Sequence, residues 1–527
     1  MVILEIQTFK LKNYVKIKNF SFFFLLFLQT QTLKQTAYIK PSNTRTGSQF
    51  GAGGTLLGES IALSSDGSTL AVGAPMESSA AKGVNGNQAD ESAYDAGAVY
   101  VFVRNGNTWR QQAYVKASNT RQSSNFGYVV RLSGDGNTMA VSAYSESSGA
   151  KGVNGDQNDE SVPQAGAVYV FTRNGNTWTQ QAYIKASNTG EAGKGDEIGD
   201  GDQFGLSLAL SNDGNTLAAG AIAEDSGAGG INGDQSDNSL QSAGAVYVFS
   251  RNGITWSQQA YVKPANPSAG DLFGYSVGLA ADGNMLAVGN FEDDGPDDKT
   301  NGIGAVYVYS RNGTVWTQQA YLRASNAEAG DSLGVSVAIS HDGNTIVSGS
   351  LDEDCLCTGV NPKDAQGNLA GSNDRASDSS TGAVYVFVRN GNAWTQQAYI
   401  KASNTGKEDW FGSRLAMSGD GNTIAAGSQL EDSSARGING KQDDESAQEA
   451  GAVYVFTRTG TTWAQQYYVK GSNTEAFDEF GSSISLSGDG RLIAAGARNE
   501  ASAAKGINGN QADNTARESG AVYIFNW

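Results

Sequence analysis

The sequence predicts an all-β fold, a seven-bladed β-propeller of four-stranded antiparallel blades whose last blade is closed by an N-terminal strand. The first observation behind this prediction is internal repetition along the chain of 527 residues. Copies of the string GAVYVF, some with one or two changes, begin at Gly97, Gly166, Gly244, Gly304, Gly382, Gly451 and Gly520. Repeats of this size are typical of units that bury their faces only against neighbouring units. We therefore expect one ring, although the length alone suggests about three or four domains.

The second observation is that every repeat contains the same strand-like segments, which we name A to D. Strand A follows a Phe-Gly or Leu-Gly step, strand B resembles LAVGA, strand C is GAVYVF and strand D resembles TWTQQAYIKA. All four are short and rich in β-branched and aromatic residues. Asp-Gly joins A to B, and Asn-Gly joins C to D in five copies, which suits tight hairpins. The blades are predicted to start near residues 50, 126, 204, 273, 333, 411 and 480.

The third observation concerns the two ends of the repeat array. The seventh unit stops after strand C at Trp527, whereas residues 33–40, LKQTAYIK, match strand D with no A, B or C before them. We therefore expect residues 33–40 to form the outer strand of the seventh blade, so that residues 33–527 make one closed propeller. Closure of this kind removes two open sheet edges.

Composition excludes several kinds of chemistry. One histidine and two cysteines cannot supply a structural zinc site of four nitrogen or sulfur ligands, a haem or an iron–sulfur centre. A net charge of -18 disfavours a nucleic-acid partner, because phosphate binding needs clustered Lys and Arg. Cys355 and Cys357 are expected to form a loop disulfide or to stay as two thiols, and their redox state is left open. His341 is expected to be an exposed turn residue.

Residues 1–30 differ from the rest of the chain. Four lysines precede an apolar stretch from Phe20 to Leu28 that only Ser21 interrupts, in the order of a secretory signal. The stretch is too short to span a bilayer. We interpret residues 1–30 as a signal peptide or an N-terminal tether, with its cleavage left open. The protein is thus predicted to be secreted or at the cell surface, with no stable transmembrane segment in the mature chain.

Together these features resemble the FG-GAP repeat, the unit of the seven-bladed propeller at the head of integrin α subunits. The resemblance rests on the Phe-Gly steps, the segment Gly73-Ala74-Pro75 and the GAVYVF copies, and it covers about residues 33–527. It implies ligand recognition through the B–C and D–A loops. Integrin repeats carry calcium loops of the form DxDxDG between strands A and B, whereas the turns here are short, as in SGDGNT at residues 133–138. Calcium needs about six to eight oxygens, so these turns are expected to be structural hairpins, similar to those of exported microbial proteins.

The B–C and D–A loops of such a meander lie on one face of the ring and carry its variation in loop length. Five B–C loops share a submotif, as in GVNGDQNDES from Gly152. Its alternating oxygen-bearing side chains are of the type that encircles calcium. They are also typical of side chains that satisfy backbone groups in a long turn. Calcium is therefore a candidate cofactor, and the candidate ligands are Asn154, Asp156, Asn158, Asp159, Asn232, Asp234 and Asp237.

Residues that differ between copies are better candidates for a unique site than residues that recur in every blade. The departures cluster in blades 3 to 5, as an acidic insertion at residues 190–203, a shortened B–C loop in blade 4 and a long loop at residues 352–381. A partner would meet an acidic, asymmetric rim there, and sequence drift in tolerant loops is the alternative. The candidate binding residues are Asp196, Asp200, Asp202, Asp293, Asp294, Asp352, Asp354 and Trp410.

The predicted function is that of an exported, non-enzymatic binding or adhesion protein. It would act as a monomeric propeller that recognises a protein or a glycan at the cell surface. One alternative is a hydrolase that uses loop carboxylates, and another is a structural surface or matrix component. We disfavour the enzyme because the sequence has neither a nucleophile elbow nor an HExxH motif. The ligand, the host and the oligomeric state are left open.

Overall fold

The computed structural model describes residues 32–52, 58–190, 201–296, 299–371 and 379–527. Met1–Thr32 and Leu33–Trp527 are separate units, and the described strands belong to the second. The signal interpretation of residues 1–30 therefore lies outside the described residues. Within the described ranges, no helix has the length and hydrophobicity needed to cross a membrane.

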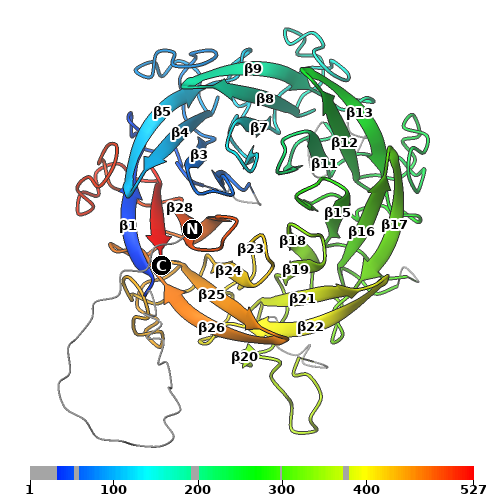
Figure 1. Ribbon diagram of the computed structural model, residues 1–527, viewed down its shortest axis with the longest axis vertical. Coiled ribbons are helices and arrows are strands. Elements are labelled where there is room, and N and C mark those ends of the chain that lie inside the picture. The colour runs from blue at the N-terminus through cyan, green and yellow to red at the C-terminus, as the bar shows by residue number, and fades with distance from the viewer. Residues whose placement is uncertain (1–31, 53–57, 191–200, 297–298, 372–378) are drawn as a thin grey trace, which may run out of the picture. The chain divides into compact units, whose positions relative to one another are not determined.

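Leu33–Trp527 forms the predicted propeller, with seven antiparallel sheets arranged as a ring (Figure 1). In blades 1 to 7, in this order, strand A is β2 (Ile61–Leu63), β6 (Val130–Leu132), β10 (Ser207–Leu210), β14 (Ser276–Leu279), β18 (Leu333–Ile339), β23 (Arg414–Met417) and β27 (Phe480–Leu486). Strand B is β3 (Thr69–Ala74), β7 (Thr138–Ala143), β11 (Thr216–Ala221), β15 (Met285–Asn290), β19 (Thr345–Ser350), β24 (Thr423–Ser428) or β28 (Leu492–Ala497). Strand C is β4 (Ala98–Asn105), β8 (Ala167–Asn174), β12 (Ala245–Asn252), β16 (Ala305–Asn312), β21 (Ala383–Asn390), β25 (Ala452–Thr459) or β29 (Ala521–Asn526). Strand D is β5 (Thr108–Val115), β9 (Thr177–Ile184), β13 (Thr255–Val262), β17 (Val315–Leu322), β22 (Ala393–Lys401), β26 (Thr462–Val469) or β1 (Lys34–Ile39), and blade 5 adds the short β20 (Gly359–Val360).

The seventh blade is closed by the N-terminal strand, as predicted. Its strand order is β1-β29-β28-β27, and β1 pairs antiparallel with β29 from Lys34–Asn526 to Ile39–Val522. The first and last strands of the ring thus share one sheet. Both edges of β29 are thereby paired, which leaves neither of them open to another chain.

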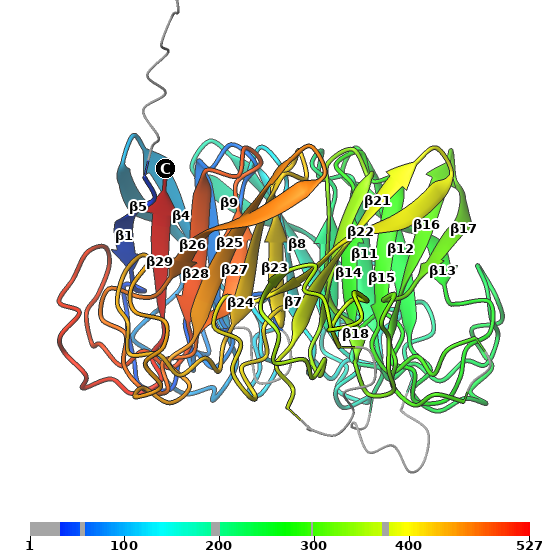
Figure 2. The ribbon, with the colours of Figure 1, turned by 90° about the horizontal axis from the view of Figure 1, so that it is seen from below.

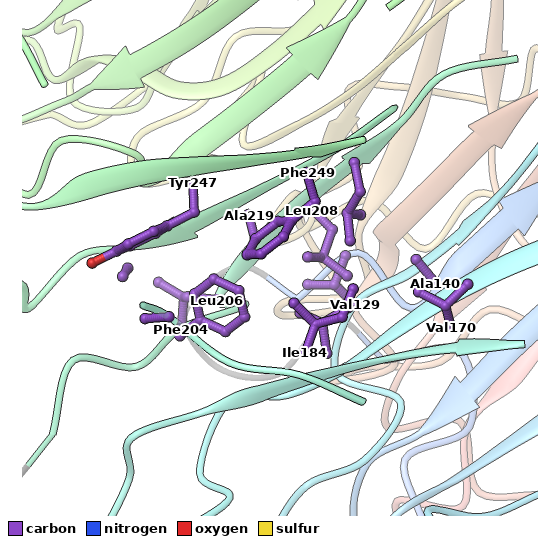
Figure 3. Packing of buried hydrophobic residues seen from close by; sticks show 14 of the residues in the cluster. Val129, Ala140, Val170, Ile184, Phe204, Leu206, Leu208, Ala219, Tyr247 and Phe249 are labelled. Carbon is purple, nitrogen blue, oxygen red and sulfur yellow. The ribbon is translucent and has the colours of Figure 1, made fainter. Parts of the chain in front are cut away.

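Neighbouring blades interlock through the residues of the Phe-Gly step. Phe204, just before β10, packs edge-on against Tyr247 and Phe249, with ring centroids 5.5 and 6.0 Å apart. The same buried cluster includes Ile184 and Val170 of blade 2 (Figure 3). Burial of this kind contributes roughly 25 cal/mol for each Å² of apolar surface removed from water. Each blade therefore depends on its neighbours for a core.

Glycine is required where the Phe-Gly step meets the preceding blade. Gly97 has a φ of 79° and forms a parallel bridge with Phe126 of the next blade. A Cβ added to Gly97 would lie 2.0 Å from the Phe126 carbonyl oxygen. Since any side chain would push the two blades apart, this contact explains why strand C starts with glycine.

Tryptophans at the start of strand D lie between blades, as predicted. Trp178 of blade 2 is 2% exposed and belongs to a core cluster with residues of blade 1. Its Nε1 donates to Gln112 Oε1 of blade 1 at 2.9 Å, and Arg173 stacks over its ring at 5.3 Å. Gln112 is the bulged residue of β5, because the register with β4 skips it. The bulge thus aims a polar side chain at the next blade.

The two faces of the ring differ in their connections (Figure 2). One face holds the A–B and C–D hairpins, and the other holds the longer B–C and D–A loops. The A–B turns are structural hairpins, since Asp135 Oδ1 accepts hydrogen bonds from Ser133 Oγ and from the Asn137 amide. The loop face is therefore where length and sequence vary, as expected of loops on a rigid scaffold.

Seven backbone hydrogen bonds close a ring at the centre of the hairpin face. Each residue donates its amide to the carbonyl of the next, at 2.8 to 3.1 Å, and the last returns to the first. In order they are Ser65, Gly134, Asn212, Ala281, His341, Gly419 and Gly488. The expectation that His341 is exposed is wrong, because its half-buried imidazole packs on Gly419, and a Cβ added to that glycine would lie 2.4 Å from Nδ1. Burial lowers the pKa of His341.

Candidate ligand-binding site on the loop face

Six blades support their loop face with the same buried ion pair. In blade 6, Lys470 Nζ lies 2.7 Å from a Glu431 oxygen, and the two side chains are 0% and 2% exposed. Glu431 also accepts hydrogen bonds from the Tyr468 hydroxyl and the Asn404 amide. It therefore joins strand D of its own blade to the D–A loop before it. The other pairs, at 2.5 to 2.9 Å, are Lys40–Glu500, Lys116–Glu77, Lys185–Glu146, Lys263–Glu224 and Lys401–Glu353.

Five of the same blades cover strand D with the submotif of the B–C loop. Asn439 has a φ of 53°, and its side-chain oxygen accepts a hydrogen bond from the Tyr468 amide. Ile438 next to it forms a bridge with Val469 at the outer edge of β26. Asn tolerates this left-handed conformation and can bond to backbone groups at the same time. The loop thus folds back over its own blade as a partial fifth strand.

Blade 4 departs from this arrangement. Residues 291–304 connect β15 to β16, whereas residues 429–451 connect β24 to β25 in blade 6. Asp293 replaces the glutamate, and its carboxylate accepts hydrogen bonds from the hydroxyls of Tyr307 and Tyr321 at 2.7 and 2.5 Å. No B–C residue in the described part of this loop forms a bridge with β17. The described residues of this shorter loop therefore leave the outer edge of β17 without the cover that the other blades have.

A pocket of about 220 Å³ lies where the long loop would be. Its lining combines the D–A loop before blade 4, the short B–C loop and strand D. The lining residues are Ala265, Asn266, Ser268, Asp271, Asp293, Asp294, Gly295, Pro296, Tyr307, Gln318 and Tyr321. Gln318 is exposed and Tyr321 is half-buried, whereas Gln180 is half-buried and Tyr183 is fully buried at the same positions of blade 2. At this pocket, Gln318 and Tyr321 are thus more exposed than their counterparts in blade 2.

The pocket is rich in hydrogen-bond acceptors. Burial, helped by the nearby charges of Asp293 and Asp294, raises the pKa of Asp271 to about 7, although a hydrogen bond from the Ser268 amide acts in the opposite direction. Asp271 is 4% exposed, and its carboxylate accepts that amide at 3.1 Å. Carboxylate, amide and hydroxyl groups in one concave site can hold a ligand that offers hydroxyl or amino groups.

Comparison with known families identifies the repeat. Five segments match the FG-GAP repeat family, at residues 109–171, 256–309, 316–366, 394–456 and 463–525, and together they cover more than half of the chain. The chain belongs to the FG-GAP repeat family. Four of the five segments run from the start of strand D to strand C of the next blade. The FG-GAP unit with the insertion at residues 190–203 lies between two of the matches.

Comparison with individual proteins adds no function to this FG-GAP propeller. No curated protein matches the chain. Among solved structures, it is similar to a candidate 6-phosphogluconolactonase from Bacteroides uniformis, with 10% sequence identity and a TM-score of 0.42. That similarity covers 79% of this chain and 87% of the other. A likeness this distant gives no argument about activity.

The structure places the predicted binding residues of the FG-GAP propeller in their own loops. Asp196 and Asp200 lie outside the described residues. Asp294 Oδ1 accepts the Gly302 amide, and Asp354 Oδ1 accepts the amides of Ser379 and Ser380. Asp225 and Asp432 bind loop amides in the same way in blades 3 and 6. Asp225, Asp294, Asp354 and Asp432 therefore share the role of ordering their loops. Of the predicted binding residues that the structure describes, Asp293 and Asp294 line the pocket of blade 4.

The remaining predicted binding residues lie in three different loops. Asp202 is 5% exposed and accepts the Gly190 amide. Asp352 accepts hydrogen bonds from the hydroxyls of Ser332 and Ser380, both at 3.0 Å. Trp410 is half-buried, with a φ of 57°. Every blade has a positive φ at the residue before its Phe-Gly or Leu-Gly step, so this conformation belongs to the scaffold. Ligand contact by these residues stays a prediction.

The candidate calcium ligands hold the B–C loops in shape. Asn154 and Asn232 accept the amides of Tyr183 and Tyr261 in strand D. Asp156, Asp159, Asp234 and Asp237 each accept the amide two residues ahead. Asn158 donates one of these amides. Within the described ranges, no three His, Cys, Asp or Glu side chains are grouped to hold a metal. Calcium binding stays a prediction that titration calorimetry can test.

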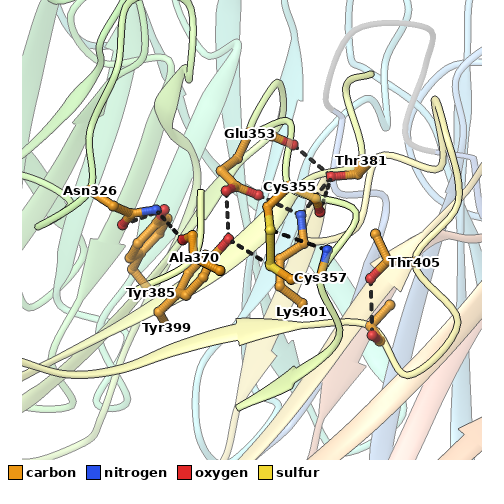
Figure 4. The surroundings of a disulfide bond; sticks show 11 residues. Asn326, Glu353, Cys355, Cys357, Ala370, Thr381, Tyr385, Tyr399, Lys401 and Thr405 are labelled. Atoms are coloured by element: carbon orange, nitrogen blue, oxygen red, sulfur yellow. Dashed lines mark hydrogen bonds and ion pairs between the residues drawn. A yellow bond between two sulfur atoms is a disulfide. The ribbon is translucent and has the colours of Figure 1, made fainter. Parts of the chain in front are cut away.

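Cys355 and Cys357 form a disulfide in the B–C loop of blade 5 (Figure 4). The bond lies beside the buried group that supports the loop, since the Tyr399 hydroxyl donates to Glu353 Oε1 at 2.5 Å. Lys401 Nζ contacts the same glutamate. One of the two expectations for these cysteines is thus confirmed. The loop also uses an asparagine as the other blades do, since Asn361 accepts a hydrogen bond from the Tyr399 amide, and the Cys357 sulfur lies 3.6 Å from the Tyr399 hydroxyl.

The central channel holds charged residues that the sequence patterns did not single out. Its cavity of about 200 Å³ is lined by strand A of all seven blades. Arg414 is 3% exposed and occupies a position where five other copies have serine. Arg131 stands where the other copies have only Ala, Gly or Ser, and it pairs with Glu59. Aligning the seven copies of strand A would have revealed both arginines.

Buried aspartates in the D–A loops predict how stability depends on pH. Burial raises the pKa of Asp202 to about 8 and of Asp271, Asp409 and Asp478 to about 7. Because the folded protein holds these protons at pH values where the unfolded chain has lost them, stability falls as pH rises from about 4 to about 8. Each group changes the unfolding free energy by at most about 1.4 kcal/mol per pH unit. The melting temperature should therefore be higher at pH 6 than at pH 8.

Thermal melts in buffers from pH 5.5 to 8.5 check this dependence. Asp409→Asn should flatten the slope, because the amide cannot ionise. Asp443→Asn, at an exposed position, should leave the slope unchanged. A melting temperature that rises with pH across this range would show that the aspartates are ionised in the folded protein.

Proposed function

We propose that the protein is a non-enzymatic, exported binding propeller that holds a protein or surface glycan at its loop face. The contact site in this proposal is the pocket of blade 4, lined by Asp271, Asp294, Gln318 and Tyr321. One observation supports the proposal above all. Strand D of blade 4 is open at positions that other blades cover with their own B–C loop. A scaffold that repeats one protective loop and omits it at a single blade leaves that blade free for a partner.

The chemistry of the pocket favours a ligand that donates hydrogen bonds. Both oxygens of Asp293 are already engaged by tyrosine hydroxyls, so Asp293 fixes the wall. Gln318 is exposed at the pocket, and Asp294 lines it with one carboxylate oxygen bonded to the Gly302 amide. A sugar hydroxyl or a protein amino group would match these acceptors.

The hydrolase alternative has one feature in its favour, since Asp271 has a raised pKa beside the ionisable Asp293. Such a pair is typical of acid–base catalysis. However, Asp202, Asp409 and Asp478 show the same rise at the same place in three other blades. Burial in the shared scaffold accounts for the pKa of Asp271, so we do not propose catalysis.

A glycan array and a panel of immobilised extracellular-matrix proteins provide the probes for a binding test. Gln318→Ala should weaken binding about tenfold, which corresponds to about one lost hydrogen bond to a ligand. Ser268→Trp should abolish binding by filling the pocket. Gln180→Ala is the matched control, because that glutamine sits at the same repeat position under a long loop and bonds to Ser118.

Two results would contradict the proposal. Binding that survives Ser268→Trp and Gln318→Ala would place the contact elsewhere on the ring. Turnover of a bound glycan that Asp271→Asn removes would favour the hydrolase.

A further inference from the structure

Among the described residues, Arg414 is a buried cation that lacks the carboxylate partner of the six buried lysines. Six buried lysines each lie 2.5 to 2.9 Å from a glutamate oxygen. In the described part of the chain, no carboxylate lies within 4.0 Å of the Arg414 guanidinium. Its Nε donates to the Ser482 carbonyl at 2.9 Å, and its Nη1 donates to the Ser413 carbonyl at 2.8 Å. These neutral acceptors fix the side chain and leave its charge uncompensated.

The nearest acid is already engaged. Glu59 is the carboxylate with the largest effect on the pKa of Arg414, and it forms an ion pair with Arg131. Two guanidinium groups thus share one carboxylate in the wall of the channel. Burial of an uncompensated charge costs several kcal/mol, and arginine cannot avoid this cost by losing its proton. The site therefore favours a negative charge from outside the chain.

Unpaired hydroxyls and a small cavity lie next to Arg414. Ser413 Oγ and Ser482 Oγ are buried and have no hydrogen-bond partner in the described structure. Both residues also contribute the carbonyls that hold the guanidinium. A cavity of about 20 Å³ is lined by Arg414, Ser413 and the Arg131–Glu59 pair, together with residues of the inner strands. A volume of this size is enough for a small group and too small for a large organic anion.

We propose that the channel binds a small anion at Arg414, of the size of chloride or of the carboxylate of formate. The guanidinium supplies the opposite charge, and the hydroxyl of Ser413, which also lines the cavity, supplies a further donor. The position of Arg414 at the start of β23 places this anion in the half of the channel next to the D–A loop. The anion would join the inner strands of several blades, because the cavity is lined by Arg414 of blade 6, Ser336 of blade 5 and Arg131 of blade 2.

Thermal melts at equal ionic strength in chloride, formate or gluconate test the proposal. The wild-type melting temperature should be about 1–3 °C higher in saturating chloride or formate than in gluconate, which is too large for the cavity. Arg414→Ser should remove the difference, and the five serines at equivalent positions indicate that this variant folds. Arg436→Ser, at an exposed position, should keep the difference and so controls for general salt effects.

Crystals of the wild-type protein in bromide provide a measurement that does not depend on a variant. An anomalous peak beside Arg414 is expected. A response to chloride alone would assign a halide site, and a response to formate as well would assign a site that also admits carboxylates. Equal melting temperatures in all three salts, or an undiminished difference in Arg414→Ser, would overturn the proposal.

Discussion

Deletion of residues 1–40 is expected to abolish cooperative unfolding of the propeller, whereas deletion of residues 1–32 should leave it intact. Tyr38, Ile39 and Lys40 are all 0% exposed in the closed ring. Without them, β29 presents an open edge and Glu500 loses both its lysine and its tyrosine partner. The combined loss approaches the roughly 5–15 kcal/mol that stabilises a typical domain.

Calorimetry and size-exclusion chromatography measure this effect together. The shorter deletion should melt in one sharp transition and elute as the wild type does. The longer deletion should lose that transition and associate through its exposed strand. A synthetic peptide of residues 33–45 should restore part of the transition, because it can refill the position of β1. A deletion of residues 1–40 that melts within about 2 °C of the wild type would show that the ring does not depend on this closure.

Glu431→Ala is expected to have the second largest effect, lowering the free energy of unfolding by about 3–5 kcal/mol. The substitution leaves the ammonium of Lys470 buried and without its carboxylate. It also removes the acceptor of the Tyr468 hydroxyl and the Asn404 amide. The link between the D–A loop of one blade and strand D of the next is lost with it.

Urea unfolding at pH 7 measures this difference. Asp443→Ala provides the control in the same loop, because its ion pair with Lys441 is exposed and should not affect the midpoint. The double variant Glu431→Leu with Lys470→Met should recover part of the loss, since it removes both charges at similar volume. Equal midpoints for Glu431→Ala and Asp443→Ala would mean that the buried pair adds nothing to stability.

The buried pairs explain why the loop face is uniform except at blade 4. Each Glu–Lys pair anchors the start of a long B–C loop, and in all six blades that loop pairs with the outer edge of strand D next to an asparagine. At blade 4, Asp293 is one methylene shorter than glutamate, is engaged by two tyrosines and stands in a shorter loop. The pocket is thus a consequence of one exchanged anchor and one shortened connection. Both are visible in the sequence, but their joint effect depends on how the loop folds back.

The sequence by itself determined the ring. Seven copies of GAVYVF, the hairpin dipeptides and the lone strand at residues 33–40 predicted the blades, their strand order and their closure. These features are local or repeat along the chain, so hydrophobic alternation and turn chemistry are sufficient to infer them. The packing of Trp178 against the preceding blade also followed from its repetition.

Only the tertiary structure decided where the unusual residues meet. Asp294 and Asp354 were both predicted as binding residues and both accept amides of their own loops, but only Asp294 lies at the pocket of blade 4. Arg414 and Arg131 looked like ordinary strand residues, yet the ring brings them into one channel. Repetition in the sequence predicts which residues occupy equivalent positions in the blades. The closed ring, however, brings residues from distant repeats together around the central channel. The contacts at that axis depend on all seven blades, and no single repeat contains them.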